Sequence, residues 1–410
     1  MNVFRQKAVF FSKWIIAIYP LMIGLQFVHL FINSFRHGVI ISVILLIMLF
    51  WLIFIKKIKV VKSDVDLIVL FYFIYNVFSI LLLLLSKVSI SIGIAEFATG
   101  LFPVLFYLVG RDNSLREQLF LQYFLKSVFF MIIVGYIFYI FNPEIYFRYM
   151  ENNSYMFFRS VYMQNPRMVS FIGSSSVGAL STCSFAYFIH QITMKKEKML
   201  KNMCIGLLSL GAAILSLQRV AWLCCILIII SYSMFVSRNK LRTAIIMSIF
   251  IILAVIIITN FPNLVQVLEW RINGSENIFS ERNGNWLKVF DQNILSLLLG
   301  NGLGSSGHRA MEQNKMVIVD GNYFKMIYEI GLIGTGLFIM IIIAGLLNGY
   351  KKFRKGYKNM MMYLAFVSVI CIHGIGSSVF TFQIVVILFW YSLGRCQAKI
   401  SGDLLEGIEK

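Results

Sequence analysis

Charged residues are scarce in this chain of 410 residues. Only 13% of the residues are Asp, Glu, Lys or Arg, and 59% are hydrophobic, whereas about a quarter of an average soluble domain is charged. This composition excludes a water-soluble fold. The apolar/polar alternation of transmembrane barrel strands, over about ten residues each, is also missing. The elements that cross the membrane are therefore expected to be α-helices.

Several signatures of soluble enzymes and metalloproteins are missing too. The sequence has no Walker-type glycine loop, no HExxH spacing, no Gly-x-Ser-x-Gly elbow and no CxxC pair among its six cysteines. We therefore expect no bound metal and no cofactor, and we interpret the cysteines as small hydrophobic residues. Because no internal repeat or Pro- or Ser-rich linker interrupts the chain, residues 1–410 are predicted to form a single membrane domain.

Long apolar runs recur throughout the sequence. A helix of about 20 apolar residues crosses the hydrocarbon core of a bilayer. The runs predict an all-α, polytopic integral membrane protein with about twelve transmembrane helices. The expected spans are 10–32, 38–55, 64–85, 90–109, 118–141, 168–191, 203–217, 219–236, 242–260, 321–347, 359–378 and 379–394.

The basic residues indicate the orientation of these spans. With the N-terminus in the cytoplasm, the short inner connections are rich in Lys and Arg, as in 351–358 and as the positive-inside rule requires. Both termini are then cytoplasmic, and the first apolar stretch is retained as a signal anchor. Much of the formal charge of +19 is thus an orientation signal, and we expect the lipid bilayer, not nucleic acid, as the partner.

Two connections on the outer side are unusually long. The first, residues 142–167, is rich in aromatic residues and carries Arg159 and Arg167. The second, residues 261–320, is long enough for a small extracytoplasmic subdomain and contains the glycine-dense turn Gly300–Gly307. The inner connections leave little room for a catalytic fold, so we expect the chemistry at the outer face.

Arg219 lies between two apolar stretches without a basic neighbour. A charge in hydrocarbon costs several kcal/mol unless it reaches a cavity, a partner or the interface. Two interpretations fit this position. The arginine either extends from a helix end to the interface, or it binds an anion at an outward-facing turn, where its planar guanidinium suits phosphate.

Two further arginines are predicted on the same side of the membrane. Arg282 precedes an amphipathic stretch in the second external loop, and Arg167 precedes the sixth span. Taken alone, Arg282 can be interpreted as a solvated charge in a loop, and Arg167 can be interpreted as an anchor at the membrane interface. Together with Arg219 they supply enough positive charge to neutralise a diphosphate.

Polar residues also flank the start of the span 321–347. Asp320 is either a helix cap or a carboxylate that accepts a proton from an attacking hydroxyl. Lys325 and Glu329 are spaced to form an ion pair within one helix, or to line a substrate cavity. His308 and Arg309, directly after the glycine turn, are further candidates for substrate binding.

The order of these motifs resembles the O-antigen polymerase and ligase superfamily. The resemblance covers about residues 160–345. It rests on four features: Ser-Leu-Gln-Arg219 after a short span, Glu281-Arg282 in a long external loop, the turn Leu299–Gly304, and the stretch from Asp320 to Gly331 and Gly334. The first five expected spans match only as generic hydrophobic helices.

The resemblance implies a GT-C-like fold and a metal-independent, inverting glycosyltransferase at the outer face of the plasma membrane. Its substrate is an undecaprenyl-diphosphate-linked oligosaccharide, and a flippase and a chain-length regulator are the implied partners. Arg219 and Arg282 match the family's arginines that stabilise the diphosphate leaving group. Ligase relatives carry a histidine at the position of Asp320, so the aspartate favours a polymerase.

Two other functions remain open. A ligase would move finished glycan to a lipid or protein acceptor and would differ from a polymerase only in that acceptor. A transporter or flippase of lipid-linked sugars is the third hypothesis. Transporters with twelve spans often have two related halves, whereas here the long loop and the arginine motifs fall in the second half.

Overall fold

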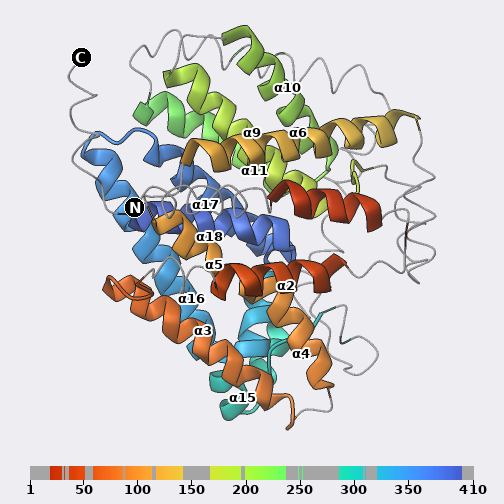
Figure 1. The fold of residues 1–410 in the computed structure, drawn as a ribbon, viewed down its shortest axis with the longest axis vertical. Coiled ribbons are helices and arrows are strands. Elements are labelled where there is room, and N and C mark those ends of the chain that lie inside the picture. Colours follow the sequence, from red (N-terminus) through yellow and green to blue (C-terminus); the bar gives the residue numbers. More distant parts are fainter. Residues whose placement is uncertain are drawn as a thin grey trace, which may run out of the picture.

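The structure is a computed structural model, and its elements are helical wherever it describes the chain (Figure 1). The described residues are 19–29, 32, 37–50, 59–85, 88–112, 117–141, 167–194, 199–236, 248, 252, 286–307, 310 and 321–398.

Residues 19–29 form the first described helix. The other α-helices are α2 (His37–Phe50), α3 (Asp64–Leu82), α4 (Ile90–Glu96), α5 (Leu105–Arg111), α6 (Glu117–Phe141), α9 (Ser174–Met194), α10 (Met199–Leu215), α11 (Arg219–Ser231), α15 (Ile294–Leu299), α16 (Asn322–Arg354), α17 (Met360–Gly376) and α18 (Gln383–Gln397). Two π-helical segments, η2 (Phe97–Leu101) and η4 (Tyr232–Val236), and three 3₁₀ segments, η3 (Phe102–Val104), η5 (Lys288–Asp291) and η7 (Val379–Thr381), complete the described elements.

Five helical stretches in the described part are long and apolar enough to cross a membrane: Asp64–Leu82, Ile90–Arg111, Leu119–Phe141, Arg219–Val236 and Asn322–Arg354. The all-α prediction is therefore confirmed for the described residues, and their composition is that of an α-helical membrane protein. Two shorter helices, α10 and α17, are also apolar.

The expected spans differ from the observed helices in four places. The span 168–191 is helical only from Ser174, where α9 begins. The span 90–109 is not one regular helix, because η2 and η3 separate α4 from α5. The span 321–347 extends to Arg354 and is interrupted within it. Residues 379–394 begin as the separate segment η7 before α18 starts. The expected span 242–260 lies almost wholly outside the described residues.

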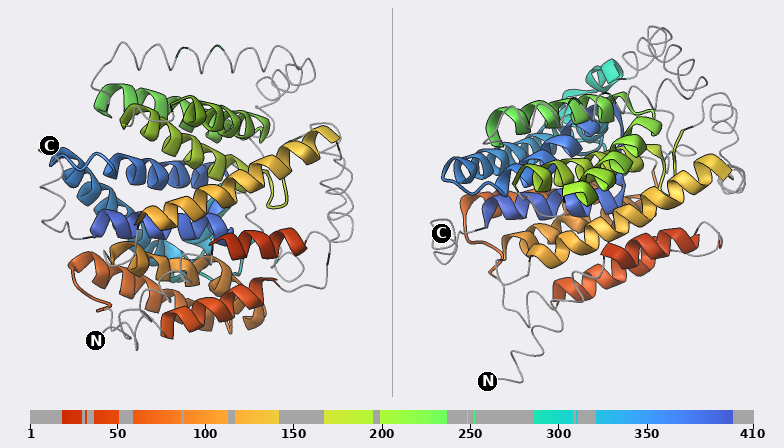
Figure 2. Two further views of the ribbon diagram at one scale, coloured as in Figure 1. Left: turned by 45° about the horizontal axis from the view of Figure 1, so that its top comes forward. Right: turned by 90° about the horizontal axis from the view of Figure 1, so that it is seen from above.

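Helix α18 lies in the interior of the bundle, with α17 beside it (Figures 1 and 2). Every residue from Gln383 to Gly394 is buried, as expected for a helix that is apolar on all sides. α18 packs closely on α5, because a side chain at Gly110 would overlap the Tyr391 carbonyl and one at Gly394 would overlap the Tyr107 carbonyl. Small residues allow such close backbone approach in membrane proteins.

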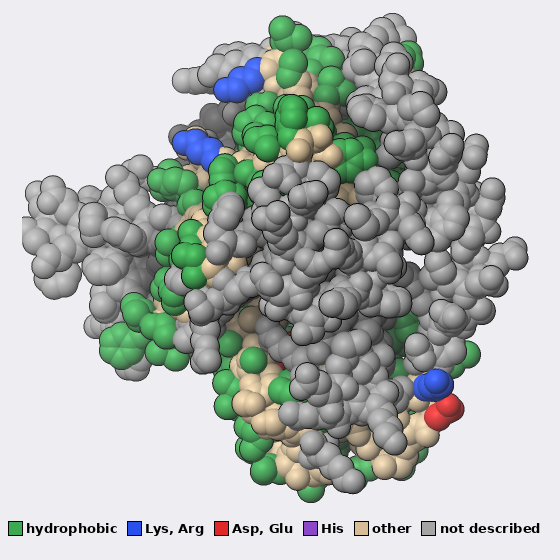
Figure 3. Space-filling view, turned by 90° about the vertical axis from the view of Figure 1, so that its right-hand side faces the viewer, with side chains coloured by type: hydrophobic (Ala, Val, Ile, Leu, Met, Phe, Trp, Pro, Cys, Tyr) green, Lys and Arg blue, Asp and Glu red, His purple; other side chains and the backbone are tan. Residues whose placement is uncertain are grey.

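Helix α3 shows the reversed polarity of a membrane helix. Its large apolar residues, such as Phe71 (53% exposed) and Phe78 (50% exposed), point outward, while Asp66, Asn76 and Ser79 are buried. Hydrophobic side chains also cover much of the described part of the face in Figure 3. An apolar outer surface fits lipid, and the buried polar residues face the interior, where Asp66 pairs with Arg111 at 2.7 Å.

Candidate functional site

Helix α16 is interrupted at Gly331, which has φ 65° and ψ −177°. Carbonyl groups just before such a break lose their usual donors one turn ahead. Here the Asn301 amide donates to Tyr328 O at 2.9 Å, and the Gly302 amide donates to Glu329 O at 2.9 Å. The glycine turn therefore supplies the hydrogen-bond donors that a broken membrane helix needs.

Glycine is required on both sides of this contact. Gly300 (φ 87°) and Gly331 both adopt left-handed backbone conformations, which glycine reaches without steric cost. A side chain at Gly300 would also overlap the Glu329 carbonyl, and one at Gly331 would overlap the Leu298 carbonyl. Two of the four features behind the resemblance, the turn Leu299–Gly304 and the stretch that includes Gly331, therefore contact each other through their backbones.

Helix α3 holds the same assembly from another side. The Ser79 hydroxyl donates to Glu329 O at 3.2 Å, and the Tyr75 hydroxyl donates to Leu299 O at 3.0 Å. The Leu303 amide donates to Ser79 O at 3.3 Å. The break in α16 is therefore fixed by α3 and by the glycine turn together.

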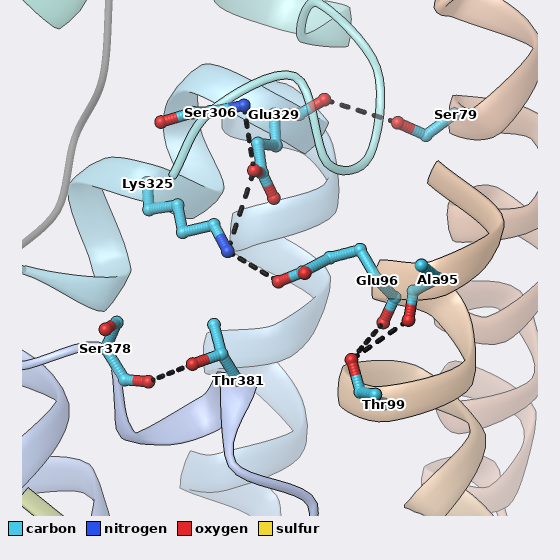
Figure 4. A network of polar contacts seen from close by, with 9 residues as sticks. All are labelled: Ser79, Ala95, Glu96, Thr99, Ser306, Lys325, Glu329, Ser378 and Thr381. Carbon is cyan, nitrogen blue, oxygen red and sulfur yellow. Dashed lines mark hydrogen bonds and ion pairs between the residues drawn. The ribbon is translucent and has the colours of Figure 1, made fainter. Parts of the chain in front are cut away.

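A buried polar cluster lies next to this break (Figure 4). Lys325 Nζ is 2.5 Å from Glu96 Oε1 and 3.7 Å from Glu329 Oε1. The Ser306 amide donates to Glu329 Oε1 at 3.1 Å. Each of the three charged side chains is at most 11% exposed, so their interactions act in an environment of low dielectric constant.

Glu96 comes from the last turn of α4, directly before the π-helical segment η2. Thr99 Oγ1 donates to Ala95 O at 3.0 Å, and Gln383 Nε2 donates to Ala98 O at 3.2 Å. Single π-helical turns occur frequently at functional sites, where they reposition side chains. This widened turn sets the position of the Glu96 carboxylate opposite Lys325.

A cavity of about 60 Å³ adjoins the cluster. Glu96, Lys325 and Glu329 line it, together with Asn322 at the start of α16 and Trp390 of α18. Asn322 is only 3% exposed, and its Oδ1 atom has no hydrogen-bond partner in the described structure. Since buried polar atoms are almost always paired, this acceptor is available for a ligand.

Arg219 is the first residue of α11 and is exposed. The turn before it includes Leu217 with φ 52°. The Met168 amide donates to Leu215 O at 2.8 Å, and Gln218 Nε2 donates to Ser174 Oγ at 3.3 Å. These bonds hold the segment that follows Arg167 against the turn that presents Arg219.

The end of α17 connects the Arg219 turn to the start of α16. A side chain at Gly376 would meet Val220 at 3.3 Å, and one at Gly374 would meet Tyr323 at 3.5 Å. The Tyr323 hydroxyl donates to Cys371 O at 3.0 Å. The first residues of α11 and α16, which carry Arg219 and Asn322, therefore lie at the same end of α17.

The predicted site residues are only partly described. Lys325 and Glu329 form the expected ion pair and also line a cavity, and that a substrate enters this cavity stays a prediction. Arg167 and Arg219 are placed near one another through the backbone contacts above. The described part of the chain does not include Asp320, Arg282, Arg159, His308 or Arg309.

Glu96 was not predicted as a site residue. The signal was present, because it is a lone carboxylate in the apolar stretch 90–109, and an ionisable residue within a span is a functional candidate. Among the described residues, no group of three or more His, Cys, Asp or Glu side chains is arranged to hold a metal ion. All six cysteines are described and free.

No protein-family model matches this chain, and neither does any curated protein.

Proposed function

We propose that this protein is a polymerase of undecaprenyl-diphosphate-linked oligosaccharide repeat units, active at the outer face of the plasma membrane. The proposal includes about twelve spans, cytoplasmic termini and a GT-C-like, metal-independent, inverting glycosyltransferase. The product is an O-antigen, capsule or exopolysaccharide chain. A flippase that delivers the repeat unit and a chain-length regulator are the proposed partners.

One observation carries this proposal. The turn that precedes Arg219 lies at the same end of α17 as the start of α16. The buried cluster and the cavity adjoin this start of α16. A cationic group that suits a diphosphate and a polar cavity that suits a sugar thus lie toward the same end of one helix, which supports transfer from a lipid diphosphate to a sugar hydroxyl.

The proposed reaction is a single displacement at the anomeric carbon of the growing glycan. The acceptor hydroxyl oxygen attacks this carbon, and the bond to the diphosphate oxygen breaks, with its electron pair leaving on the diphosphate. Arg219 and Arg282, assisted by Arg167, stabilise the charge that develops there. Asp320, which directly precedes Gly321 and Asn322, accepts the proton of the attacking hydroxyl.

Reconstitution tests this function directly. Purified protein in liposomes is supplied with the lipid-linked repeat unit, and the product is resolved by gel electrophoresis. Wild type is expected to give a ladder of glycans, and Arg219→Ala is expected to abolish it. Arg354→Ala, at an exposed arginine at the end of α16, is the matched control and should retain the ladder. A folded wild-type protein that gives no ladder contradicts the polymerase.

A transporter is the alternative function that the discontinuous helix α16 favours. Many transporters bind their substrates at such breaks near the middle of the membrane. The same liposomes distinguish the two functions. Movement of the lipid-linked unit between leaflets without extension would identify a transporter, and a single transfer to a lipid or protein acceptor would identify a ligase.

A further inference from the structure

The buried cluster is rich in hydrogen-bond acceptors. Glu96 and Glu329 contribute two carboxyl groups, and Lys325 contributes one ammonium group. Each of these side chains is at most 11% exposed, so their polar atoms are shielded little from a ligand in the adjoining cavity. A sugar hydroxyl can donate hydrogen bonds to carboxyl oxygens, whereas a diphosphate has only acceptors to offer them.

The cavity offers acceptors for such a ligand. Asn322 Oδ1 is buried without a hydrogen-bond partner among the described residues, and it lines the same cavity as both carboxylates. Each hydroxyl group of a ligand can donate one hydrogen bond, so different hydroxyls can each bond to one of these acceptors. This combination of one unpaired amide oxygen and two carboxylates is suited to a polyol.

Aromatic side chains also line the cavity. Trp390, Phe338 and Phe380 line it, and Tyr72 packs beside Phe338 with ring centroids 5.6 Å apart. Binding sites for small molecules commonly combine an apolar, aromatic wall with a few convergent polar groups. A sugar ring has both kinds of surface, since its C–H groups are apolar and its hydroxyls are polar.

The volume limits how much of a sugar enters. About 60 Å³ holds about four to six water molecules, at 10–15 Å³ of this measure for each. That is room for one edge of a single ring with its hydroxyl groups, and not for an oligosaccharide.

We propose that this cavity, between α3, η2, α16 and α18, binds one edge of an uncharged sugar ring of the acceptor repeat unit. This inference rests on the proposed polymerase function and assigns the acceptor to a place distinct from the arginines. Asn322 Oδ1 and the Glu329 carboxylate accept hydrogen bonds from the ring hydroxyls. Lys325 holds Glu96 and Glu329 in position, and no covalent bond forms in the cavity.

Binding of a soluble sugar tests the assignment. The probe is the repeat oligosaccharide released from its carrier by mild acid, which carries neither lipid nor diphosphate. Its affinity for the full-length protein in nanodiscs is measured by calorimetry. Asn322→Ala is expected to weaken binding about tenfold, the loss of about one good hydrogen bond. Asn348→Ala, an equivalent change near the other end of α16, should bind as wild type does.

A second variant protects the test against misfolding. Asn322→Leu keeps a similar volume and removes both polar atoms, and it should also lose the probe while eluting as a monodisperse peak. Wild-type affinity in either folded Asn322 variant would overturn the proposal. So would displacement of the oligosaccharide by inorganic pyrophosphate, which would show that the cavity takes the diphosphate.

The outcomes separate this inference from the proposed function. A ladder in liposomes without binding of the free oligosaccharide overturns the sugar site and leaves the polymerase. Binding that depends on Asn322, without a ladder, supports the sugar site and contradicts the proposed polymerase function.

Discussion

The Lys325 ammonium group donates a hydrogen bond to the Glu96 carboxylate at 2.5 Å, across 229 residues of sequence. The pair is buried and joins the end of α4 to the first half of α16, next to the break at Gly331. The desolvation cost of burying two charges is offset only when the geometry is good and further hydrogen bonds are made. The arrangement therefore orders the cavity wall, and it need not add to the overall stability.

Removing the lysine should destabilise the protein strongly. Lys325→Met leaves Glu96 and Glu329 buried and close together without the cation, which costs about 3–5 kcal/mol for a broken buried pair. We expect a clearly lower Tm in detergent, measured by differential scanning fluorimetry. Lys355→Met, at an exposed lysine just after α16, is the control.

A double variant checks the cause of that loss. Adding Glu96→Gln to Lys325→Met removes the charge of one of the two buried carboxyl groups and should recover part of the lost Tm. If the double variant is less stable than Lys325→Met alone, charge imbalance is not the cause.

The break in α16 gives a second prediction. Gly331→Ala forces a positive φ with an extended ψ on a non-glycine residue, at a cost of about 1–3 kcal/mol, and adds an overlap with the Leu298 carbonyl. We expect a lower Tm and weaker binding of the soluble oligosaccharide, because the first half of α16 shifts. Both are measured in the same detergent-purified sample.

Gly336 is the matched control on the same helix. A side chain there meets nothing within 4 Å, so Gly336→Ala should be neutral or stabilise the helix by about 0.5–1 kcal/mol. Equal changes in Tm for the two substitutions would mean that the effect of Gly331→Ala does not come from the break in α16.

Particular residues show how far the sequence predicts this structure. The helices follow from the apolar runs, and Arg219, Lys325 and Glu329 are recognisable because charge is rare in such runs. The pairing of Lys325 with Glu96 is not predictable, since no periodicity relates positions so far apart. Gly331 reads as an ordinary glycine in an apolar helix, because its break depends on donors from Asn301 and Gly302.

The proposed orientation can be tested by labelling. In a cysteine-free background, Asp291→Cys, at the exposed end of η5, should react with a membrane-impermeant maleimide in intact cells. Lys355→Cys, beyond the other end of α16, should react only after the membrane is permeabilised. The reverse pattern would place Arg219 on the cytoplasmic side and would contradict the proposal of a polymerase at the outer face.

The geometry of the Arg219 side chain matters as well as its charge. A guanidinium group can grip a diphosphate through two parallel hydrogen bonds, whereas an ammonium group acts as a point charge. Loss of one group that stabilises transition-state charge typically costs about 10²–10³ in kcat, which is expected for Arg219→Ala. Arg219→Lys should fall between that variant and wild type, with a larger loss in kcat than change in KM for the lipid-linked unit. Rates are measured from the ladder assay over a range of substrate concentrations. An Arg219→Lys enzyme with wild-type kcat would show that Arg219 only anchors the helix end at the interface.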